Sequence, residues 1–533
     1  MIGWIDRYVA QVAGMALALA VMLVLALPGF FTLPPVDRDE ARFAQSSAQM
    51  LDSGDFIDIR LGDEVRYKKP VGIYWLQATA AALTGAADQI WSYRLVSLAG
   101  SMLAVGFTFA LARLILPGSA AFLAAVVLAS SILLGAEARL AKTDAMLLAT
   151  IMAGQVVLAR AFLPGGRQQV PALHRREIWG FWIALAAGIL IKGPIGPLVT
   201  GLTLAGLCLI RRDAAIVRVL RPLPGLGLVA LLVLPWLIAI TLKSDGAFWA
   251  KSIGQDMLAK LGQGQESHGA PPGTYLALVW LTFWPGSVLF VAALAAIWRG
   301  RRHPVVQFAA VWVVPFWLIF ELTATKLVHY VLPTYPALAV LAVWGVLQAA
   351  PRRAFWVAAG LAGVVPLALL SAFFIAAARL GGPVGLPFWA GVAGLCIALP
   401  LLLFALRQRA WGATATGLFV ASLALSVAIY PSLAQMKVLW LAPRIAAIAG
   451  AAPDCTLSVV GYQEPSLLFA TRRAALIETA AQAKARLDQP GCVILVIDEA
   501  QDFTPAGLAA TGLVAGLNLG TGKMMRLQVY ERR

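Results

Sequence analysis

The chain has 533 residues, of which 60% are hydrophobic and only 13% are charged, and its mean hydropathy is +0.80. Soluble domains carry about 25% charged residues, so the composition excludes an ordinary soluble protein and indicates a membrane protein with many spans. The formal net charge of +16 would suit a nucleic-acid partner. However, the arginines fall in short loops between apolar runs, which is the positive-inside pattern of membrane proteins, and we expect no nucleic acid.

Thirteen apolar runs follow one another along the chain and predict an all-α polytopic membrane domain of about thirteen helices over residues 1–430. The first run is too long for a signal peptide and lacks a clear cleavage site, so we expect it to remain as a span. The runs are Val9–Phe31, Tyr93–Leu116, Ala120–Ala136, Ala145–Phe162, Ile178–Ile191, Ile195–Ile210, Leu223–Leu242, Tyr275–Trp298, Val305–Phe320, Val331–Leu347, Phe355–Ala377, Phe388–Leu406 and Gly412–Ile429.

Basic clusters recur at every second connection between these runs, which predicts that those connections are cytoplasmic. Parity then places the loop 32–92, the turn 137–144 and the tail 431–533 on the outer face of the membrane. A short apolar stretch, Ile73–Leu83, predicts a half-buried helix along the membrane surface.

The tail predicts a small α/β domain, because strand-like runs alternate in it with a helix-like run. The expected elements are strands at Thr456–Val460, Val493–Ile497 and Arg526–Tyr530 and a helix at Ala480–Leu487. The tail also holds Cys455 and Cys492, and oxidising conditions outside the inner membrane would permit a disulfide between them.

The segment Pro34–Trp75 is the most polar part of the first half of the chain, and we interpret it as an active-site loop on the bilayer surface. Asp39–Leu51 has an apolar face at helical spacing, so Asp39 and Glu40 would lie in a first helical turn. Stabilisation of the helix end explains Glu40 best. Asp39, with Arg42 one turn along beside it, is a candidate catalytic carboxylate.

Cations on the outer side of a positive-inside protein require an explanation, and an anionic ligand supplies one. Lys68 and Lys69, followed by a proline, suit a lipid phosphate; the alternative is that both side chains only reach the headgroup region. Lys192 lies in one outer turn, and Lys326 and His329 lie in another.

Two residues stay open between a structural and a functional role. Asp144, which begins an apolar run at the outer face, is either a helix cap or a second active-site carboxylate. His268, in the longest later outer loop, is either a surface residue or part of the site. We find no P-loop or Rossmann glycine motif, so a lipid-linked substrate is expected rather than a nucleotide.

Taken together, these motifs resemble the bacterial lipid A aminoarabinose transferases. Those enzymes belong to the polyprenyl-phosphate-sugar-dependent membrane glycosyltransferases of the GT-C fold, which include the protein O-mannosyltransferases. The matching segments are Asp39–Ala44, Met50–Asp55, Arg66–Pro70, Lys192–Pro194, His268–Pro271 and Lys326–Pro336.

The resemblance implies an inverting glycosyltransferase that moves a sugar from a polyprenyl-phosphate donor to a lipid A or lipopolysaccharide acceptor at the periplasmic face. It also implies a monomer. The catalytic residues would be Asp39 and Asp144. By the same resemblance, Arg42 and Lys69 would bind the phosphate, and His268 falls where the family has a histidine near a metal ion. The residues themselves add Tyr67, Lys68, Lys192, Lys326 and His329 as candidate substrate-binding residues.

One residue departs from the family pattern, which commonly has glutamate before the Lys-Pro pair where this chain has Lys68. A carboxylate that could bind a divalent ion is therefore replaced by a cation. This leaves a divalent metal ion and a metal-free site as alternatives, and it indicates a more anionic donor or acceptor, for example a uronic acid.

Other functions remain as alternatives at this stage. They are glycosylation of a protein or of another glycolipid, transport or flipping of a polyprenyl-linked sugar, and a scaffold that binds partners through its tail. A transporter should carry charged residues near the bilayer midplane. Here they gather at one face, which favours the enzyme.

Overall fold

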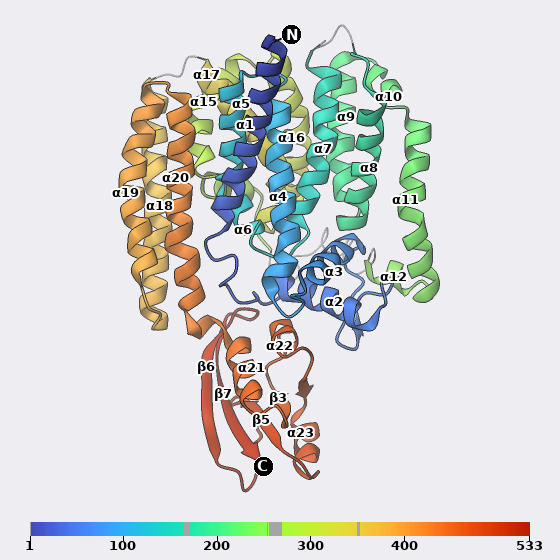
Figure 1. Cartoon of the computed structure of the whole chain (residues 1–533), viewed down its shortest axis with the longest axis vertical. Coiled ribbons are helices and arrows are strands. Elements are labelled where there is room, and N and C mark those ends of the chain that lie inside the picture. The colour runs from blue at the N-terminus through green and yellow to red at the C-terminus, as the bar shows by residue number, and fades with distance from the viewer. Residues whose placement is uncertain (1, 165–169, 253, 255–268, 349–351, 533) are drawn as a thin grey trace.

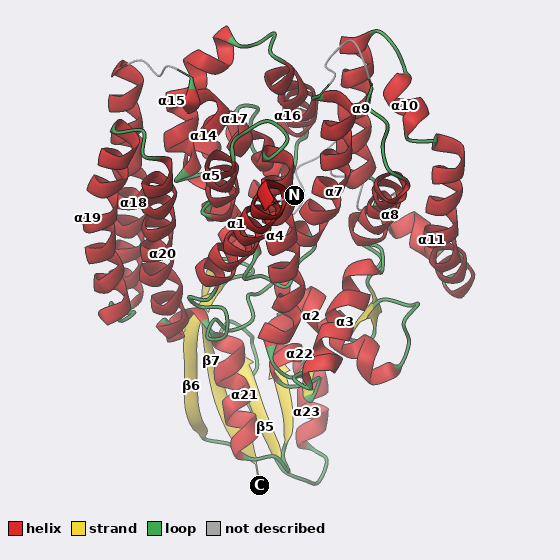
Figure 2. Ribbon diagram, turned by 45° about the horizontal axis from the view of Figure 1, so that its top comes forward, coloured by secondary structure: helices red, strands yellow, loops and turns green. Residues whose placement is uncertain are grey.

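The computed structural model describes residues 2–164, 170–252, 254, 269–348 and 352–532. A bundle of helices is followed by a smaller unit that contains a sheet (Figures 1 and 2). The N-terminus lies at one end of the bundle, and the tail and the C-terminus lie at the other (Figure 1). The predicted fold class, an all-α polytopic domain with a small α/β tail, is confirmed.

The membrane domain is built from helices that run up and down the bundle. They are α1 (Ile2–Ala26), α4 (Ile90–Ala112), α5 (Gly118–Ala129), α6 (Ile132–Glu137), α7 (Asp144–Phe162), α8 (Arg175–Lys192), α9 (Ile195–Arg211), α10 (Ala215–Val219), α11 (Pro222–Lys243), α12 (Ala247–Trp249), α14 (Thr274–Thr282), α15 (Gly286–Arg299), α16 (Pro304–Leu322), the 3₁₀ helix η2 (Val328–Thr334), α17 (Tyr335–Leu347), α18 (Arg352–Leu380), α19 (Leu386–Arg407) and α20 (Trp411–Gln435).

Each predicted apolar run falls largely within one helix or a pair of consecutive helices. Length and composition qualify eight helices of the described chain as spans, or nine if α14 and α15, which meet at 119°, form one broken span. The run Ala120–Ala136 is divided at Ser130 between α5 and α6, which leaves two short helices. A count of thirteen is therefore not confirmed and stays a prediction.

Helices α4 and α7 approach each other closely at a glycine, and this contact positions the site. A Cβ atom on Gly100 would lie 2.6 Å from the Cα atom of Met146, so only glycine fits at this crossing. Asp144 opens α7 two residues before that contact. The close approach therefore fixes the start of α7 against α4.

The loop between α1 and α4 folds as a small layer at the end of the bundle that faces the tail (Figure 1). It contains α2 (Asp39–Ser53), the hairpin strands β1 (Arg60–Leu61) and β2 (Glu64–Val65), and α3 (Gly72–Thr84). These helices confirm the two that the sequence predicts in this loop. Gly54 ends α2 with φ of 69°, the left-handed conformation that glycine adopts readily.

The tail forms a five-stranded sheet in the order β4-β3-β5-β7-β6, in which β3 is parallel to β4 and β5, and β7 is antiparallel to β5 and β6. Its elements are η3 (Lys437–Leu439), α21 (Leu441–Ala451), β3 (Thr456–Val460), α22 (Pro465–Ala470), β4 (Ala475–Glu478), α23 (Ala480–Leu487), β5 (Val493–Asp498), β6 (Ala510–Asn518) and β7 (Lys523–Arg532).

All four elements that the sequence predicts in the tail are present, and η3, α21, α22, β4 and β6 are additional. Successive side chains of β5 point to opposite faces of the sheet, so each face is covered by a different set of helices. Ile494 and Val496 pack with α21 and α22, whereas Leu495 and Ile497 pack with α23. The predicted division of the chain at residue 430 is not tested, and α20 itself ends at Gln435.

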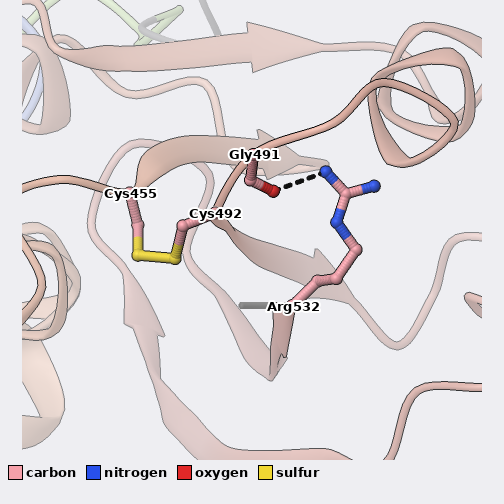
Figure 3. Close-up of a disulfide and its surroundings, with 4 residues drawn as sticks. All are labelled: Cys455, Gly491, Cys492 and Arg532. Carbon is pink, nitrogen blue, oxygen red and sulfur yellow. Dashed lines mark hydrogen bonds between the residues drawn. A yellow bond between two sulfur atoms is a disulfide. The ribbon is translucent and has the colours of Figure 1, made fainter.

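The predicted disulfide is confirmed: Cys455, just before β3, is bonded to Cys492, just before β5 (Figure 3). Beside it, the guanidinium of Arg532 donates a hydrogen bond to the carbonyl oxygen of Gly491 at 2.6 Å. The disulfide thus joins the beginnings of two neighbouring parallel strands.

We expect the disulfide to stabilise the tail by about 4 kcal/mol, because it closes a loop of 37 residues in the unfolded chain. Replacing Cys455 and Cys492 together by serine should lower the free energy of unfolding of the tail by that amount. Thiol labelling of the denatured, unreduced protein should detect only Cys208 and Cys396. Labelling of all four cysteines before reduction would contradict the disulfide.

Candidate active site

Ionisable side chains from separate segments converge where α6, α7, α8 and η2 meet, at the end of the bundle that carries the tail. The ammonium of Lys142 lies 3.1 Å from Oε1 of Glu137. Asp144 forms an ion pair with Lys192. His329 lies between the two pairs, with Nδ1 3.7 Å from Glu137 Oε1 and Nε2 3.8 Å from Asp144 Oδ1.

This cluster is largely removed from solvent: the side chains of Glu137 and Asp144 are 4% and 6% exposed, and those of Lys142 and Lys192 are each 10% exposed. Burial of single charges is costly, so charges of opposite sign are held together here. Oε2 of Glu137 has no hydrogen-bond partner among the described residues. The cluster therefore retains an unsatisfied acceptor.

The turn 137–144 is held in place by contacts with three other segments. Arg139, which is 1% exposed, donates to the carbonyl oxygen of Pro28 at 2.8 Å and lies 4.0 Å from the centre of the Tyr430 ring. Ser97 on α4 exchanges hydrogen bonds with the backbone of Lys142. These contacts tie the turn to α1, α4 and α20.

Glu40 and Arg94 form a fully buried, bidentate ion pair between α2 and α4. Nε of Arg94 lies 2.8 Å from Oε1 of Glu40, and Nη2 lies 2.9 Å from Oε2. Glu40 also accepts a hydrogen bond from the backbone N–H of Ala141 at 2.9 Å. The side chain of Glu40 therefore joins the first loop to the turn 137–144. Its role is structural, as the sequence suggests, but the partner is Arg94 rather than the helix end alone.

Asp39 comes directly before Glu40 in the chain, and the charges of the cluster act on its carboxyl group. Burial raises the pKa of Asp39, but the positive charge of Lys142 lowers it. His329, Arg66 and Arg42 act in the same direction, and the pKa of Asp39 falls below its ordinary value. Asp39 is therefore ionised at neutral pH.

The structure brings Asp39, Asp144, Lys192 and His329 into one cluster, and Arg42 acts on the charge of Asp39. The other predicted residues have contacts of their own elsewhere or lie outside the described residues. Lys68 is exposed, and Nζ of Lys69 donates to the carbonyl oxygen of Lys68 at 3.0 Å. The remaining three are Tyr67, whose buried hydroxyl donates to Asp58 at 2.6 Å; Lys326, whose ammonium donates to the Thr323 carbonyl at 2.5 Å; and His268, which lies outside the described residues.

The sequence prediction missed Glu137, Lys142, Arg66 and Arg94. The first two belong to a turn with four charged residues among eight, Glu137 to Asp144, and this density of charge between apolar runs could have identified them. Arg94 lies inside an apolar run, where a lone charge indicates a buried partner. Arg66 is 7% exposed, its guanidinium lies 5.3 Å from the centre of the Phe43 ring, and its Nε has no partner among the described residues.

The residues described at the site do not fit a divalent metal ion. Within the described part of the chain, the only group of three ligand-type residues with atoms close enough to share an ion is Cys455, Cys492 and Glu531. Both cysteines are already bonded to each other. We therefore assign no step of the reaction to a metal ion.

Chemically, the site combines ionised carboxylates with several cations at the end of an apolar bundle. Such a set of cations can stabilise a phosphate group whose negative charge grows as a bond breaks. A carboxylate beside it can orient an acceptor or stabilise positive charge on carbon.

Comparisons with known proteins show what the sequence and the fold of this chain resemble. The family model described as dolichyl-phosphate-mannose-protein mannosyltransferase matches residues 13–249. The structure of ArnT from Cupriavidus metallidurans bound to undecaprenyl phosphate superimposes with a TM-score of 0.77 over 97% of both chains, at 18% identity. The predicted resemblance to the ArnT-like family is confirmed.

Two ArnT-like sequences show how far the similarity extends. An undecaprenyl phosphate-alpha-4-amino-4-deoxy-L-arabinose arabinosyl transferase from Pseudomonas paraeruginosa is 28% identical over 60% of this chain and 58% of its own length. The enzyme of the same name from Aeromonas salmonicida is 28% identical over 65% of both. The alignment thus covers less than two thirds of these ArnT-like relatives.

We expect removal of Lys142 alone to destabilise the protein by about 3–5 kcal/mol, because Glu137 would remain buried without its counter-charge. Lys142→Met should show this loss, whereas Glu137→Gln combined with Lys142→Met should recover most of it. The measurement is thermal unfolding in detergent.

The matched control is Lys243→Met, which removes an ion pair with Asp55 whose side chains are 43% and 31% exposed. Exposed pairs contribute little, so this change should cost less than about 1 kcal/mol. A double variant that is no more stable than Lys142→Met would show that Glu137 does not depend on Lys142.

Proposed function

We propose that this protein transfers a sugar from a polyprenyl-phosphate donor to a lipid A type acceptor at the outer face of the bacterial inner membrane. The observation that carries the proposal is the convergence of Asp39 with buried cations at the tail end of the bundle. The likeness in fold to an ArnT structure bound to undecaprenyl phosphate supports the donor class. The names of the relatives also support the donor class, and the acceptor class rests on the family resemblance by analogy alone.

In the proposed reaction, the bond between the anomeric carbon of the sugar and the phosphate oxygen breaks, and its electron pair leaves with the polyprenyl phosphate. Arg42 and Lys69, with Lys192, stabilise that leaving phosphate, because cations placed where negative charge develops lower the barrier. Arg66 has a free Nε donor among the described residues and serves the same purpose.

An acceptor oxygen attacks the anomeric carbon from the opposite face, so the transfer inverts its configuration. If the acceptor is a hydroxyl group, its proton passes to Asp39, which is ionised and therefore able to accept it. If the acceptor is a lipid phosphate, it is already ionised and no proton moves. Asp39 then positions the acceptor and stabilises positive charge at the anomeric carbon.

Asp144 and Tyr330 hold Lys192 beside this chemistry. Asp144 is paired with Lys192, whose ammonium also lies 5.6 Å from the centre of the Tyr330 ring. Two partners on one flexible side chain restrict where its charge can lie. We assign Asp144 to positioning Lys192 for the donor phosphate.

We expect Asp39→Asn to lower product formation by about 10²–10⁴-fold while undecaprenyl phosphate still binds, because the change removes the charge but keeps the shape. Product is measured by mass spectrometry of lipid A, of other envelope glycolipids and of glycoproteins from cells with and without the chain. Binding of undecaprenyl phosphate is measured on the purified protein by native mass spectrometry.

Asp52→Asn is the matched control, since Asp52 is an exposed carboxylate near the other end of the same helix. It should leave product formation unchanged. Normal product formation by a correctly inserted Asp39→Asn protein would reject the assigned role. A sugar found on a glycoprotein rather than on lipid A would correct the acceptor class.

The proposed orientation makes a separate prediction. A reporter inserted after Arg301 should report the cytoplasm, and a reporter at the C-terminus should report the periplasm, because the basic loops and the tail lie at opposite ends of the bundle (Figure 1). Paired alkaline phosphatase and green fluorescent protein fusions measure this directly. A cytoplasmic C-terminus would invert the placement of every site residue.

A further inference from the structure

The backbone of residues 36–40 is fixed from two directions, and Asp39 lies between the two attachments. On one side, Glu40 is held by Arg94 of the bundle, and the backbone N–H of Val36 donates to Glu40 Oε2 at 2.9 Å. On the other side, the half-buried Asp37 meets the tail, where Ser466, Tyr462 and Glu464 lie close enough to act on the pKa of its carboxyl group. Asp39 cannot move without disturbing one of these attachments.

Arg38, the residue between Asp37 and Asp39, has φ of 67° and ψ of −113°. A non-glycine residue rarely adopts a positive φ, and such a conformation persists only where surrounding contacts determine it. The strain at Arg38 is therefore maintained by the contacts on either side. If one of them were lost, this turn could relax and Asp39 would change direction.

The tail reaches this turn through α22, which contacts the first loop beside α2 and α3 (Figure 1). Phe469 is 6% exposed, and its ring lies edge-on to Tyr93 of α4 with centroids 5.5 Å apart. It belongs to one apolar cluster with Ala44 on α2, Ala81 on α3 and Ile90 on α4. Phe469 is thus the apolar centre of the contact.

Ion pairs surround this apolar centre. Arg472 lies 2.9 Å from Asp88, and Arg473 lies 3.7 Å from Asp63. Both arginines have positive φ values, 51° and 67°, which turn the chain sharply after α22. These pairs are exposed and contribute little energy, so Phe469 and the Asp37 contact carry the attachment.

We propose that the tail is a positioning part of the active site: Phe469 holds α2 against the bundle, Ser466 meets the turn that precedes α2, and the two together keep Asp39 directed at the buried cations. The role given to Asp39 rests on the proposed function. The attachment itself does not, so the two can be tested apart.

The protonation of Asp37 gives the attachment a pH dependence. Burial raises the pKa of Asp37 to about 6, although Ser466 and Tyr462 act to lower it, and the charge of Glu464 raises it further. A group with a raised pKa favours the attached state below its ordinary pKa, and this contribution is lost as the pH rises through about 6. Glu464 faces Asp37 from the tail, and Arg38 and Glu40 lie beside it in the turn.

The test is hydrogen exchange of α2 amides together with transfer kinetics, on the full chain in detergent. Phe469→Ala should speed exchange over residues 39–53 by about tenfold or more, since α2 loses its support. It should also lower kcat by about tenfold with little change in the KM for donor, because geometry rather than binding is disturbed. Phe469→Leu should restore most of both.

Phe503→Ala is the matched control. Phe503 packs on the opposite side of the tail sheet, with α23, so its loss weakens the tail without touching α22. Exchange in α2 and kcat should stay at wild-type values. If Phe469→Ala leaves both values unchanged, the proposal is wrong; the protection of β5 verifies that the tail is folded in each variant.

Asp37→Asn should have the opposite effect on hydrogen exchange from Phe469→Ala. It removes a carboxylate whose ionised form is unfavourable at this buried position. The protection of the amides at the start of α2, measured relative to intrinsic exchange, should therefore increase at pH 7.5 and should no longer change between pH 5 and 7. Faster exchange in this variant would overturn the attachment. A wild-type protein that transfers no sugar would reject the proposed function, and the exchange measurements would still decide whether the tail holds the turn.

Discussion

The ion pair between Glu40 and Arg94 is the interaction on which the arrangement of the site depends. Both side chains are buried, so each would be severely destabilising without the other. The remaining donors of Arg94 reach the carbonyl oxygens of Phe30 and Leu33, and Glu40 reaches the N–H of Ala141. One pair therefore joins the end of α1, the first loop, α4 and the turn 137–144.

Most of the fold could be predicted from the sequence, because apolar runs and basic loops are strong signals in a membrane protein. The strands Thr456–Val460 and Val493–Ile497 were also visible, since β-branched residues dominate them. By contrast, β6 is rich in glycine and alanine and carries little strand signal of its own. It is a strand because β7 offers it a partner along its length.

The candidate site was predicted in part. Asp39, Asp144, Lys192 and His329 could be predicted because the basic loops assign these polar residues to one and the same side of the membrane. Arg94 and Glu137 were missed because their roles arise from pairing across segments far apart in sequence, and a single sequence contains no record of such pairs. The contact between Asp37 and the tail could not be predicted for the same reason.

The placement of Phe469 against Tyr93 has a consequence for when the first loop becomes ordered during synthesis. The ribosome delivers the first loop early, but the segment that supports it emerges only after the membrane domain has been inserted. Until then no contact with the tail holds Arg38 in its strained conformation with positive φ. In a nascent or truncated chain that is already inserted in the bilayer, Asp39 would be present but would not be aligned with the buried cations. Completion of the polypeptide thus acts as the final assembly step.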